Sequence, residues 1–490
     1  MPINSLLYPS NVFIPVPHDV DNSLRFNSAG PDDLSKTFGT ATDTKKWTCS
    51  FWWKPAIAAA QQQIFSVTNG TADDTFFHIQ YRDNVEIRLN GYNTNWLTTN
   101  RKFRDYSAWY HVVVSADSTQ GTAANRLKLY INGTEETSFA TDNRGSISED
   151  QTWGINLAQP HFIGSEAGGG SGVSGYLSEF VMIDGLRLDP TSFGEFDSDS
   201  GIWKPINVSS LTFGNNGFYQ EYKQAGTGTN SSGMGADTSG NGNHFAVSNL
   251  AAVDQSTDTC TNNHMTWNPL YASAGGTYTG TEGNLHVRGS DSHNTRVGAT
   301  FAAQKGKWYW EVKQLGSVTN GGSWAGAFEV DEVDINGSTA FFGNQTKAMG
   351  VIATSSTVLP RGNGQGSGTT LGDIAVNGIL MFAMDIDNGF LYVGLNGTFL
   401  NSGDPSTGAS GTGNINNGAA GGVTYNWDFA GKLVMPGINI QNADFFETNF
   451  GSPSFAISSG NTDANGHGNF EYAVPSGYFT WNTKNLAEFG

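Results

Sequence analysis

Apolar and polar residues alternate in short runs along most of this chain, and a two-residue period is typical of half-buried β-strands. The segments 127–136 (LKLYINGTEE) and 391–400 (LYVGLNGTFL) both alternate in this way, and both contain an Asn-Gly pair. Asn-Gly is the preferred two-residue loop of a β-hairpin, because a type I′ turn requires positive φ at both central positions. Each segment also follows an apolar run that ends in Asp, at 109–117 and 378–387. The pattern therefore predicts strand, loop, strand and hairpin in both halves of the chain.

This similarity has two explanations. Asn-Gly hairpins are common in β proteins, so the first explanation is coincidence, and the second is a pair of sandwich domains with one architecture. The strand-like runs favour two domains, because two series of runs flank a stretch with little periodicity. From these runs we expect an N-terminal arm at 1–20, a first sandwich at 21–205, a loop-rich connector at 206–275, a second sandwich at 276–455 and a C-terminal tail at 456–490.

The composition favours an all-β fold for this chain of 490 residues. Charged residues make up 14% of it, well below the usual quarter, and 63 glycines indicate many turns. No segment maintains an apolar period of 3.6 residues over three helical turns. Because 37% of the residues are hydrophobic, the chain can bury more than one sizeable core. We therefore predict an all-β protein built of antiparallel β-sandwiches.

The charge balance restricts the kinds of partner. With 25 Lys and Arg against 44 Asp and Glu, the net charge is −19, and no basic run occurs. Nucleic acids and anionic membranes bind clustered cations, so both are unfavourable partners, whereas divalent cations and neutral sugars are compatible. The first twenty residues contain four prolines and no positive side chain. They predict neither a signal peptide nor a membrane helix, so we expect synthesis in a cytoplasm.

Residues 23–205 resemble laminin-G-like, concanavalin-A-type lectin sandwiches, mainly through WTCSFWWKP (47–55) and GYLSEFVMIDGLRLDP (175–190). Residues 284–451 resemble SPRY domains, mainly through GILMFAMDIDNGFLYVGLNGTF (378–399). Both families are concanavalin-like, so the resemblance implies two jelly-roll sandwiches in tandem, each with a central hairpin. The connector between them is similar to connectors in tailed-phage virion proteins of the tail-fibre type.

Concanavalin-like sandwiches include glucanases, whose active strand carries Glu-x-Asp-x-Glu with three carboxylates on one face. A retaining enzyme needs its two catalytic carboxyl groups about 5–5.5 Å apart. The nearest phrase here is FEVDEVDING, in which Glu329 and Asp331 share a face but Val333 takes the third position. A β-bulge could bring in Asp334 instead, although Asp reaches less far than the Glu of the motif. We therefore predict that the protein is not an enzyme, with a glycan hydrolase as the remote alternative.

One phrase resembles the beginning of an oxygen-rich calcium loop. Asp237, Ser239 and Asn241 alternate in DTSGNGN, and Gly242 takes the sixth position. The bidentate Glu that closes such a loop is missing, and a turn-rich connector could contain the same residues without binding a metal. Ca²⁺ is the cofactor that the sequence suggests, with an ordinary turn as the alternative.

Aromatic residues flanked by Asn, Gly and Thr are candidate glycan contacts. A flat ring beside amide groups offers a sugar an apolar face and fixed hydrogen bonds. Tyr92, Asn93, Asn95 and Trp96 in NGYNTNWLTTN, and Trp324 in NGGSWAG, fit this description. The alternative is that these rings pack within loops.

The resemblance to phage proteins implies a virion surface protein that attaches to host-surface polysaccharide, as a tail fibre or receptor-binding component does. The alternative is a capsid-decorating or tail-assembly protein that binds only other virion proteins, because SPRY domains more often bind proteins than sugars. In both cases we expect a virion protein made in the host cytoplasm, without nucleic acid or membrane insertion. We also expect a homotrimer, because multivalency strengthens weak sugar contacts and because one ring of the adjacent pair Trp52 and Trp53 needs cover from a loop or another chain.

Overall fold

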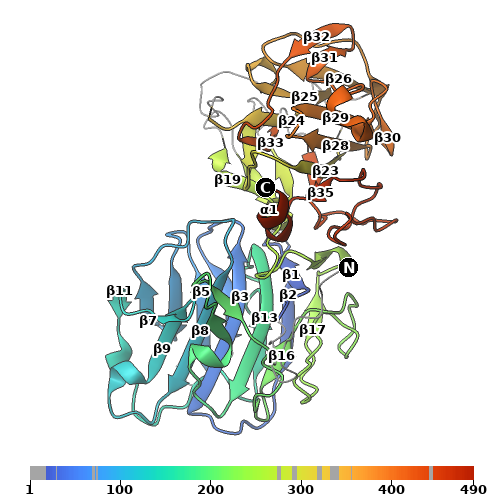
Figure 1. Ribbon diagram of the computed structural model, residues 1–490. Helices are drawn as coiled ribbons and strands as arrows, with labels where there is room; N and C mark the ends of the chain where they lie inside the picture. Colours follow the sequence, from blue (N-terminus) through green and yellow to red (C-terminus); the bar gives the residue numbers. More distant parts are fainter. Residues whose placement is uncertain are drawn as a thin grey trace, which may run out of the picture.

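Figure 1 shows a computed structural model, which describes residues 18–28, 30–68, 72, 75–272, 278–289, 295–316, 323–331, 342–354, 356–440 and 445–490. Its regular structure is almost entirely β, and the four largest sheets form two sandwiches, one above the other in the figure. The predicted all-β fold with antiparallel sandwiches is thus confirmed. Within the described residues, no helix combines the length and the apolar character needed to cross a membrane.

The first sandwich consists of two sheets, named here after a central strand. The β3 sheet has the order β10 (Thr134–Glu135), β9 (Leu127–Ile131), β8 (Tyr110–Asp117), β3 (Lys46–Pro55), β13 (Gly175–Asp184), β1 (Ser23–Phe26) and β18 (Gln255–Ser256), and β16 (Phe218–Gln220) pairs with β13. The β5 sheet has the order β11 (Phe139–Asp142), β7 (Thr94–Thr99), β6 (Ile87–Gly91), β5 (Phe76–Tyr81), β4 (Gln62–Thr68), β12 (Pro160–Ile163), β2 (Asp33–Thr37) and β17 (Ala246–Ser248).

The second sandwich also consists of two sheets. The β24 sheet has the order β19 (Trp267–Ala272), β22 (Thr295–Ala299), β33 (Val434–Ile440), β24 (Ser323–Glu329), β25 (Ala348–Ala353), β26 (Thr357–Gly362) and β27 (Gly372–Asp373). The β23 sheet has the order β20 (Thr279–Thr281), β21 (His286–Arg288), β34 (Phe445–Asn449), β23 (Lys307–Gln314), β28 (Ile379–Asp385), β29 (Phe390–Leu395) and β30 (Thr398–Phe399), and β35 (Phe479–Thr480) pairs with β23.

The remaining elements are short. Two separate hairpins pair β14 (Gly194–Phe196) with β15 (Trp203–Pro205) and β31 (Asn417–Ala420) with β32 (Val423–Asn426). The α-helix α1 (Thr483–Phe489) lies between the two sandwiches in Figure 1. Short 3₁₀ segments occur at Ala123–Asn125, Arg144–Ser146, Pro190–Ser192, Ala252–Asp254, Glu282–Asn284, Phe342–Asn344 and Pro405–Ser410.

Both Asn-Gly pairs form the predicted hairpins. Asn132 and Gly133 connect β9 to β10 with φ values of 48° and 78°. Asn396 and Gly397 connect β29 to β30 with φ values of 47° and 88°. Positive φ at both central positions is the signature of a type I′ turn, so the turn chemistry was correctly predicted from four residues.

The connector is more integrated than the sequence predicts. Its short strands β16, β17 and β18 pair with β13, β2 and β1, so they extend both sheets of the first sandwich. Met234 and Phe245, which lie within the expected loop-rich stretch, are buried in the core of that sandwich. Strands of two or three residues are too short to produce a readable period, which explains why the pattern indicated loops.

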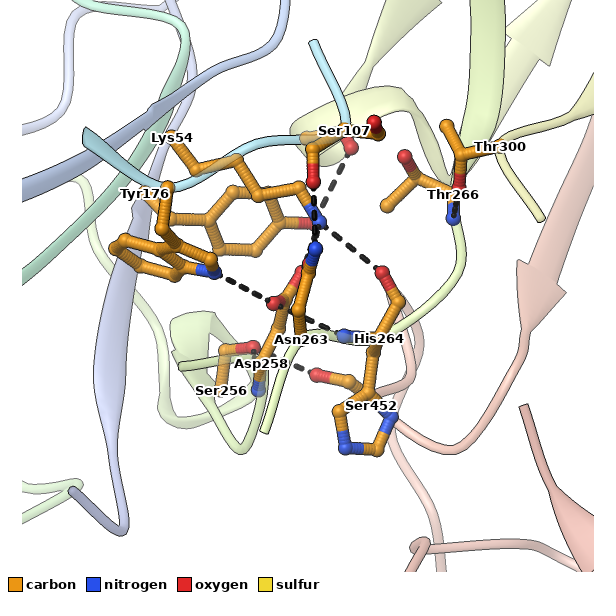
Figure 2. A network of polar contacts seen from close by, with 12 residues as sticks. Lys54, Ser107, Tyr176, Ser256, Asp258, Asn263, His264, Thr266, Thr300 and Ser452 are labelled. Atoms are coloured by element: carbon orange, nitrogen blue, oxygen red, sulfur yellow. Dashed lines mark hydrogen bonds and ion pairs between the residues drawn. The ribbon is translucent and has the colours of Figure 1, made fainter. Parts of the chain in front are cut away.

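Polar contacts between buried groups connect the first sandwich to the segment that leads into the second (Figure 2). The Lys54 ammonium donates to Asp258 Oδ2 at 2.7 Å, to Asn263 Oδ1 at 2.7 Å and to the His264 carbonyl at 3.0 Å. Asp258 Oδ1 accepts from Trp109 Nε1 at 3.1 Å. Lys54 and Asp258 are each only 1% exposed. A charge pair that is this well buried is stable only while both partners stay in place.

A second set of contacts joins the sandwiches directly. The Arg25 guanidinium, which is fully buried, donates to the Pro453 carbonyl at 2.9 Å and to Glu282 Oε2 at 3.1 Å. Ser256 and Ser452 share a hydrogen bond of 2.6 Å between their hydroxyl groups, which Figure 2 also shows. The two sandwiches therefore share a polar interface.

Candidate functional site

The two outer faces of the first sandwich differ. Over the β3 sheet, the segment from 186 to 219 buries an apolar cluster that includes Val113, Val181, Phe193 and Phe213. Over the β5 sheet, the outward residues are mainly polar, and a groove with a volume of about 330 Å³ remains open. The polar outer face of the β5 sheet, with its groove, is therefore the candidate functional site.

Alternation along β5 explains how this groove is built. Phe77, Ile79 and Tyr81 point into the core, so His78 and Gln80 between them face the groove. The neighbouring strands contribute in the same way, because Asn90 lies on β6 and Asn95 on β7. A sheet with one face on the core and one toward solvent produces such a polar row.

The amide side chains of this row form a ladder across neighbouring strands. Asn90 Nδ2 donates to Gln80 Oε1 at 2.9 Å, and Gln80 Nε2 donates to His78 Nδ1 at 3.3 Å. Gln63 on β4 pairs in register with Gln80 and is fully buried. Among the described residues, neither amide atom of Gln63 has a hydrogen-bond partner, and Asn90 Oδ1 has none. Buried polar atoms are normally paired with a donor or an acceptor. These atoms are therefore donors and acceptors that the described chain does not use.

Aromatic rings line one end of the groove. Phe76 is partly exposed, and its ring centroid lies 4.1 Å from that of His78. Tyr92 completes the group, with its ring 6.0 Å from Phe76. Burial lowers the pKa of His78 to about 4, so the imidazole is neutral at physiological pH. This end therefore offers apolar and hydrogen-bonding surface without charge.

Of the five predicted glycan contacts, three lie at or beside the groove and two do not. Asn93 and Asn95 line it, and Tyr92 lies beside Phe76 in the turn between β6 and β7. The prediction that Trp96 lies on a loop is wrong, because it is a fully buried residue of β7. Its ring packs 5.4 Å from that of Trp153 in the core, so it offers no face to a ligand.

The location predicted for Trp324 is wrong for a related reason. Trp324 is a fully buried residue of β24, and its indole Nε1 donates to the Arg361 carbonyl at 3.0 Å. The glycine beside it, Gly326, is not a loop residue, because a Cβ there would lie 2.5 Å from Gly350 Cα on β25. Glycine in a strand marks such a close backbone approach, whereas the sequence alone indicated a turn.

The calcium candidate is a loop closed by its own hydrogen bonds. Asp237 Oδ1 accepts from the backbone N–H groups of Tyr219 and Ser239, both at 2.9 Å, and Oδ2 accepts from that of Asn243 at 2.8 Å. Asn241 N donates to Ser239 Oγ at 3.3 Å. Within the described parts of the chain, no three His, Cys, Asp or Glu residues group as metal ligands would. The loop is thus stabilised as a turn, the alternative that the sequence also allowed.

Of the three candidate catalytic carboxylates, the structure describes Glu329 and Asp331. Glu329 is buried, and it accepts from Trp427 Nε1 at 2.8 Å and contacts Lys347 Nζ at 3.3 Å. Asp331 is exposed in the turn that follows β24. Asp334 lies outside the described residues. The Glu329 carboxylate thus pairs with buried or charged side chains of its own sandwich and does not face an open cleft.

Phe76, His78, Gln80 and Asn90 could not be recognised as site residues from the sequence. A signal was present, because polar His78 and Gln80 alternate with Phe77 and Ile79 in TFFHIQYRD. This alternation identifies an outward polar face but does not show that the face stays uncovered. That property depends on segments far away in the sequence.

Comparison with known proteins supports the first of the two resemblances. The family model described as the concanavalin A-like lectin/glucanases superfamily matches residues 30–189. Among solved structures, the SPRY domain of human HERC1 is 13% identical with a TM-score of 0.27, and the match covers 37% of this chain and 96% of that one. A structure described as a carbohydrate binding protein from Bacteroides ovatus ATCC 8483 is 14% identical with a TM-score of 0.33, covering 48% of this chain and 59% of that one.

A heptameric SAP-like pentraxin from Limulus polyphemus is also similar, at 17% identity and a TM-score of 0.26, covering 35% of this chain and 79% of that one. No curated protein matches the sequence. The family match supports a concanavalin A-like sandwich over residues 30–189, and this range contains the described residues that line the groove.

Proposed function

We propose that the protein binds glycans through the groove on the β5 sheet and serves as a virion attachment protein of the tail-fibre type. The observation that carries the proposal is the amide row of Gln63, Gln80 and Asn90, which leaves buried donors and acceptors unused beside an open groove. Sugar hydroxyl groups both donate and accept, so they suit amide side chains. Residues matching a family of lectins and glucanases form this groove, which supports the same function.

The arrangement also fits the shape of a sugar ring. The apolar face of a pyranose can pack on Phe76, while its hydroxyl groups reach Asn90, Asn93 and Asn95 along the adjoining strands. The buried neutral imidazole of His78 holds the amide of Gln80 in place from the base of the groove. A few fixed polar groups beside one apolar surface provide orientation as well as affinity.

The virion location and a homotrimer are part of the proposal. They rest on the resemblance of the connector and on avidity, since one shallow groove binds a sugar weakly and several grooves bind a surface firmly. The adjacent tryptophans Trp52 and Trp53 give no support to a trimer. Trp52 is covered by its own chain, because its ring lies 4.9 Å from that of His111, over which Trp203 stacks.

We further propose that binding occurs without turnover of the glycan. Hydrolysis needs two free carboxyl groups at a fixed spacing, with the acid protonated. Among the described residues that line the groove, Glu166 is the one carboxylate, and its Oε1 accepts from Ser171 Oγ at 2.8 Å. Glu329 is occupied by Trp427 in the other sandwich. A steady release of oligosaccharide by the purified chain would contradict this part of the proposal.

The test is a glycan-array and cell-binding measurement on the full chain and on the double variant Gln80→Ala/Asn90→Ala. Loss of the ladder should weaken binding roughly 10-fold or more, since each lost hydrogen bond costs about 1 kcal/mol and more where a partner stays unpaired. Asn417→Ala, an exposed position in the second sandwich, is the matched control and should bind as the wild type does. Unchanged binding by the double variant with an intact fold would place the site elsewhere.

A protein-binding role is the second candidate, and one observation favours it. Phe196 and Ile202, at the tip of the β14–β15 hairpin, are 55% and 67% exposed. Exposed apolar side chains at one tip suit contact with another virion protein. Under this alternative, Ile202→Ser would abolish incorporation into particles, and the array would show no glycan bound by the wild type.

A further inference from the structure

The groove has a basic end as well as an aromatic one. Arg82 continues the outward row of β5 beyond Gln80, and Arg88 on β6 pairs in register with Gln80. The two arginines are therefore diagonal neighbours on the same face of the sheet. Lys102 lies on the far side of Glu86, with its Nζ 2.8 Å from Glu86 Oε2. Of these three cations, Arg82 lines the groove, whereas Arg88 and Lys102 lie next to it around Glu86.

The guanidinium groups retain unused donors. Among the described residues, Arg82 Nε has no acceptor within hydrogen-bond distance, and Arg88 Nε has none, although both atoms are shielded from solvent. The one ion pair of Arg88 is with Glu86 at 3.3 Å, and Arg82 makes none within this part of the chain. The pKa of Arg82 is lowered first by partial burial and then by the nearby charge of Arg88. The nearby charges of Asp83 and Glu86 act in the opposite direction, and Glu86 is shared between the ion pairs of Arg88 and Lys102.

We infer that the groove takes an acidic saccharide, one whose carboxylate binds Arg82 and Arg88 while its ring packs toward Phe76. A guanidinium presents two parallel N–H groups that match the two oxygens of a carboxylate. Such an anion would also relieve the repulsion between the two arginines. Glu166 lines the groove as well, and its Oε1 is engaged by the Ser171 hydroxyl at 2.8 Å. This inference rests on the proposed glycan function and narrows it to one chemical class.

The experiment compares two polymers that differ only in charge, polygalacturonate and the same polymer with its carboxyl groups reduced. The wild-type chain should bind the acidic polymer about 10- to 100-fold more tightly, the value expected for hydrogen bonds to a charged group. Arg82→Gln should remove most of this preference. Arg82→Lys should keep part of it, because Lys retains the positive charge but lacks the two parallel N–H groups of a guanidinium. Raising the salt concentration should weaken binding of the acidic polymer alone.

Lys432→Gln removes one positive charge from an exposed position of the second sandwich and should leave the preference unchanged. A polymer of sialic acid, measured in parallel, distinguishes the two common sources of a sugar carboxylate, and preference for either acid supports the inference. Equal binding of the acidic and reduced polymers would overturn it while leaving the glycan function intact. Binding of no glycan at all on the array would overturn both.

Discussion

At the scale of single residues, Glu311 is the clearest case of a group whose surroundings decide its chemistry. It is fully buried on β23, and it accepts from the backbone N–H groups of Tyr472 at 2.8 Å and Glu471 at 3.0 Å. Tyr309 Oη donates to it at 3.0 Å as well. Burial nevertheless raises the pKa of Glu311 to about 7, since the desolvation of the carboxylate outweighs these donors. One carboxyl group thereby anchors the C-terminal tail to the second sandwich.

The raised pKa of Glu311 predicts a pH dependence of stability. Because the native state holds its proton more tightly than the unfolded state does, the free energy of unfolding should fall as the pH rises from about 4.5 to about 7, by on the order of 3 kcal/mol. Glu311→Gln cannot titrate, so this part of the slope should be missing from its profile. Denaturant unfolding at pH 4.5, 6 and 7.5 measures the difference. Parallel profiles for both proteins would contradict the prediction.

Residue types near the site could be predicted from the sequence, but side-chain direction could not. Asn93 and Asn95 were recognisable because a polar turn followed an alternating strand. Trp96, only one residue further, points into the core because the pairing of β7 with β6 sets its direction, and a bulge between Leu89 and Asn90 shifts that register. Register depends on the partner strand, which a local pattern does not contain.

At the scale of elements, the two hairpins share a turn but differ in what covers it. A Cβ on Gly133 would lie 2.4 Å from ring atoms of Trp203, whereas a Cβ on Gly397 would lie 3.0 Å from the ring of Tyr472. Both positions have positive φ, which costs a β-branched residue roughly 1 kcal/mol or more. Gly133→Val should therefore be the more destabilising change, by about 1–3 kcal/mol of overpacking. Thermal unfolding checks this order, with Gly39→Val as the exposed control. A reversed order would show that the Trp203 ring can move aside at little cost in free energy.

Elements that depend on adjacent residues could be predicted from the sequence, and elements that depend on distant strands could not. The turn chemistry of Asn-Gly lies in adjacent residues, so both hairpins could be located without a structure. The strands β16, β17 and β18 exist only because β13, β2 and β1 offer free edges far away in the sequence. The residues around these three strands are rich in Gly, Asn and Ser, so the sequence indicated a loose connector.

At the scale of the whole molecule, the polar junction decides how the two sandwiches behave together. The bond from Arg25 to the Pro453 carbonyl joins residues that are 428 positions apart, and the Tyr176 hydroxyl donates to the Gly283 carbonyl at 3.2 Å across the same junction. From the sequence alone, two tandem sandwiches would be expected to unfold independently, because nothing local identifies these pairs. With buried charges shared between the parts, we expect one cooperative transition instead.

Lys54 tests this coupling. Its pKa is lowered by burial, and its ammonium holds Asp258, Asn263 and His264 together at the junction. Lys54→Met should cost about 3–5 kcal/mol, because Asp258 would remain buried without its counter-charge. Calorimetry should then show the single transition of the wild type split in two, with the melting temperature of the first part lowered most. Lys45→Met removes an exposed pair with Asp150 and should change the profile little. Two transitions already present in the wild type would mean that the junction carries no coupling, however well its charges are paired.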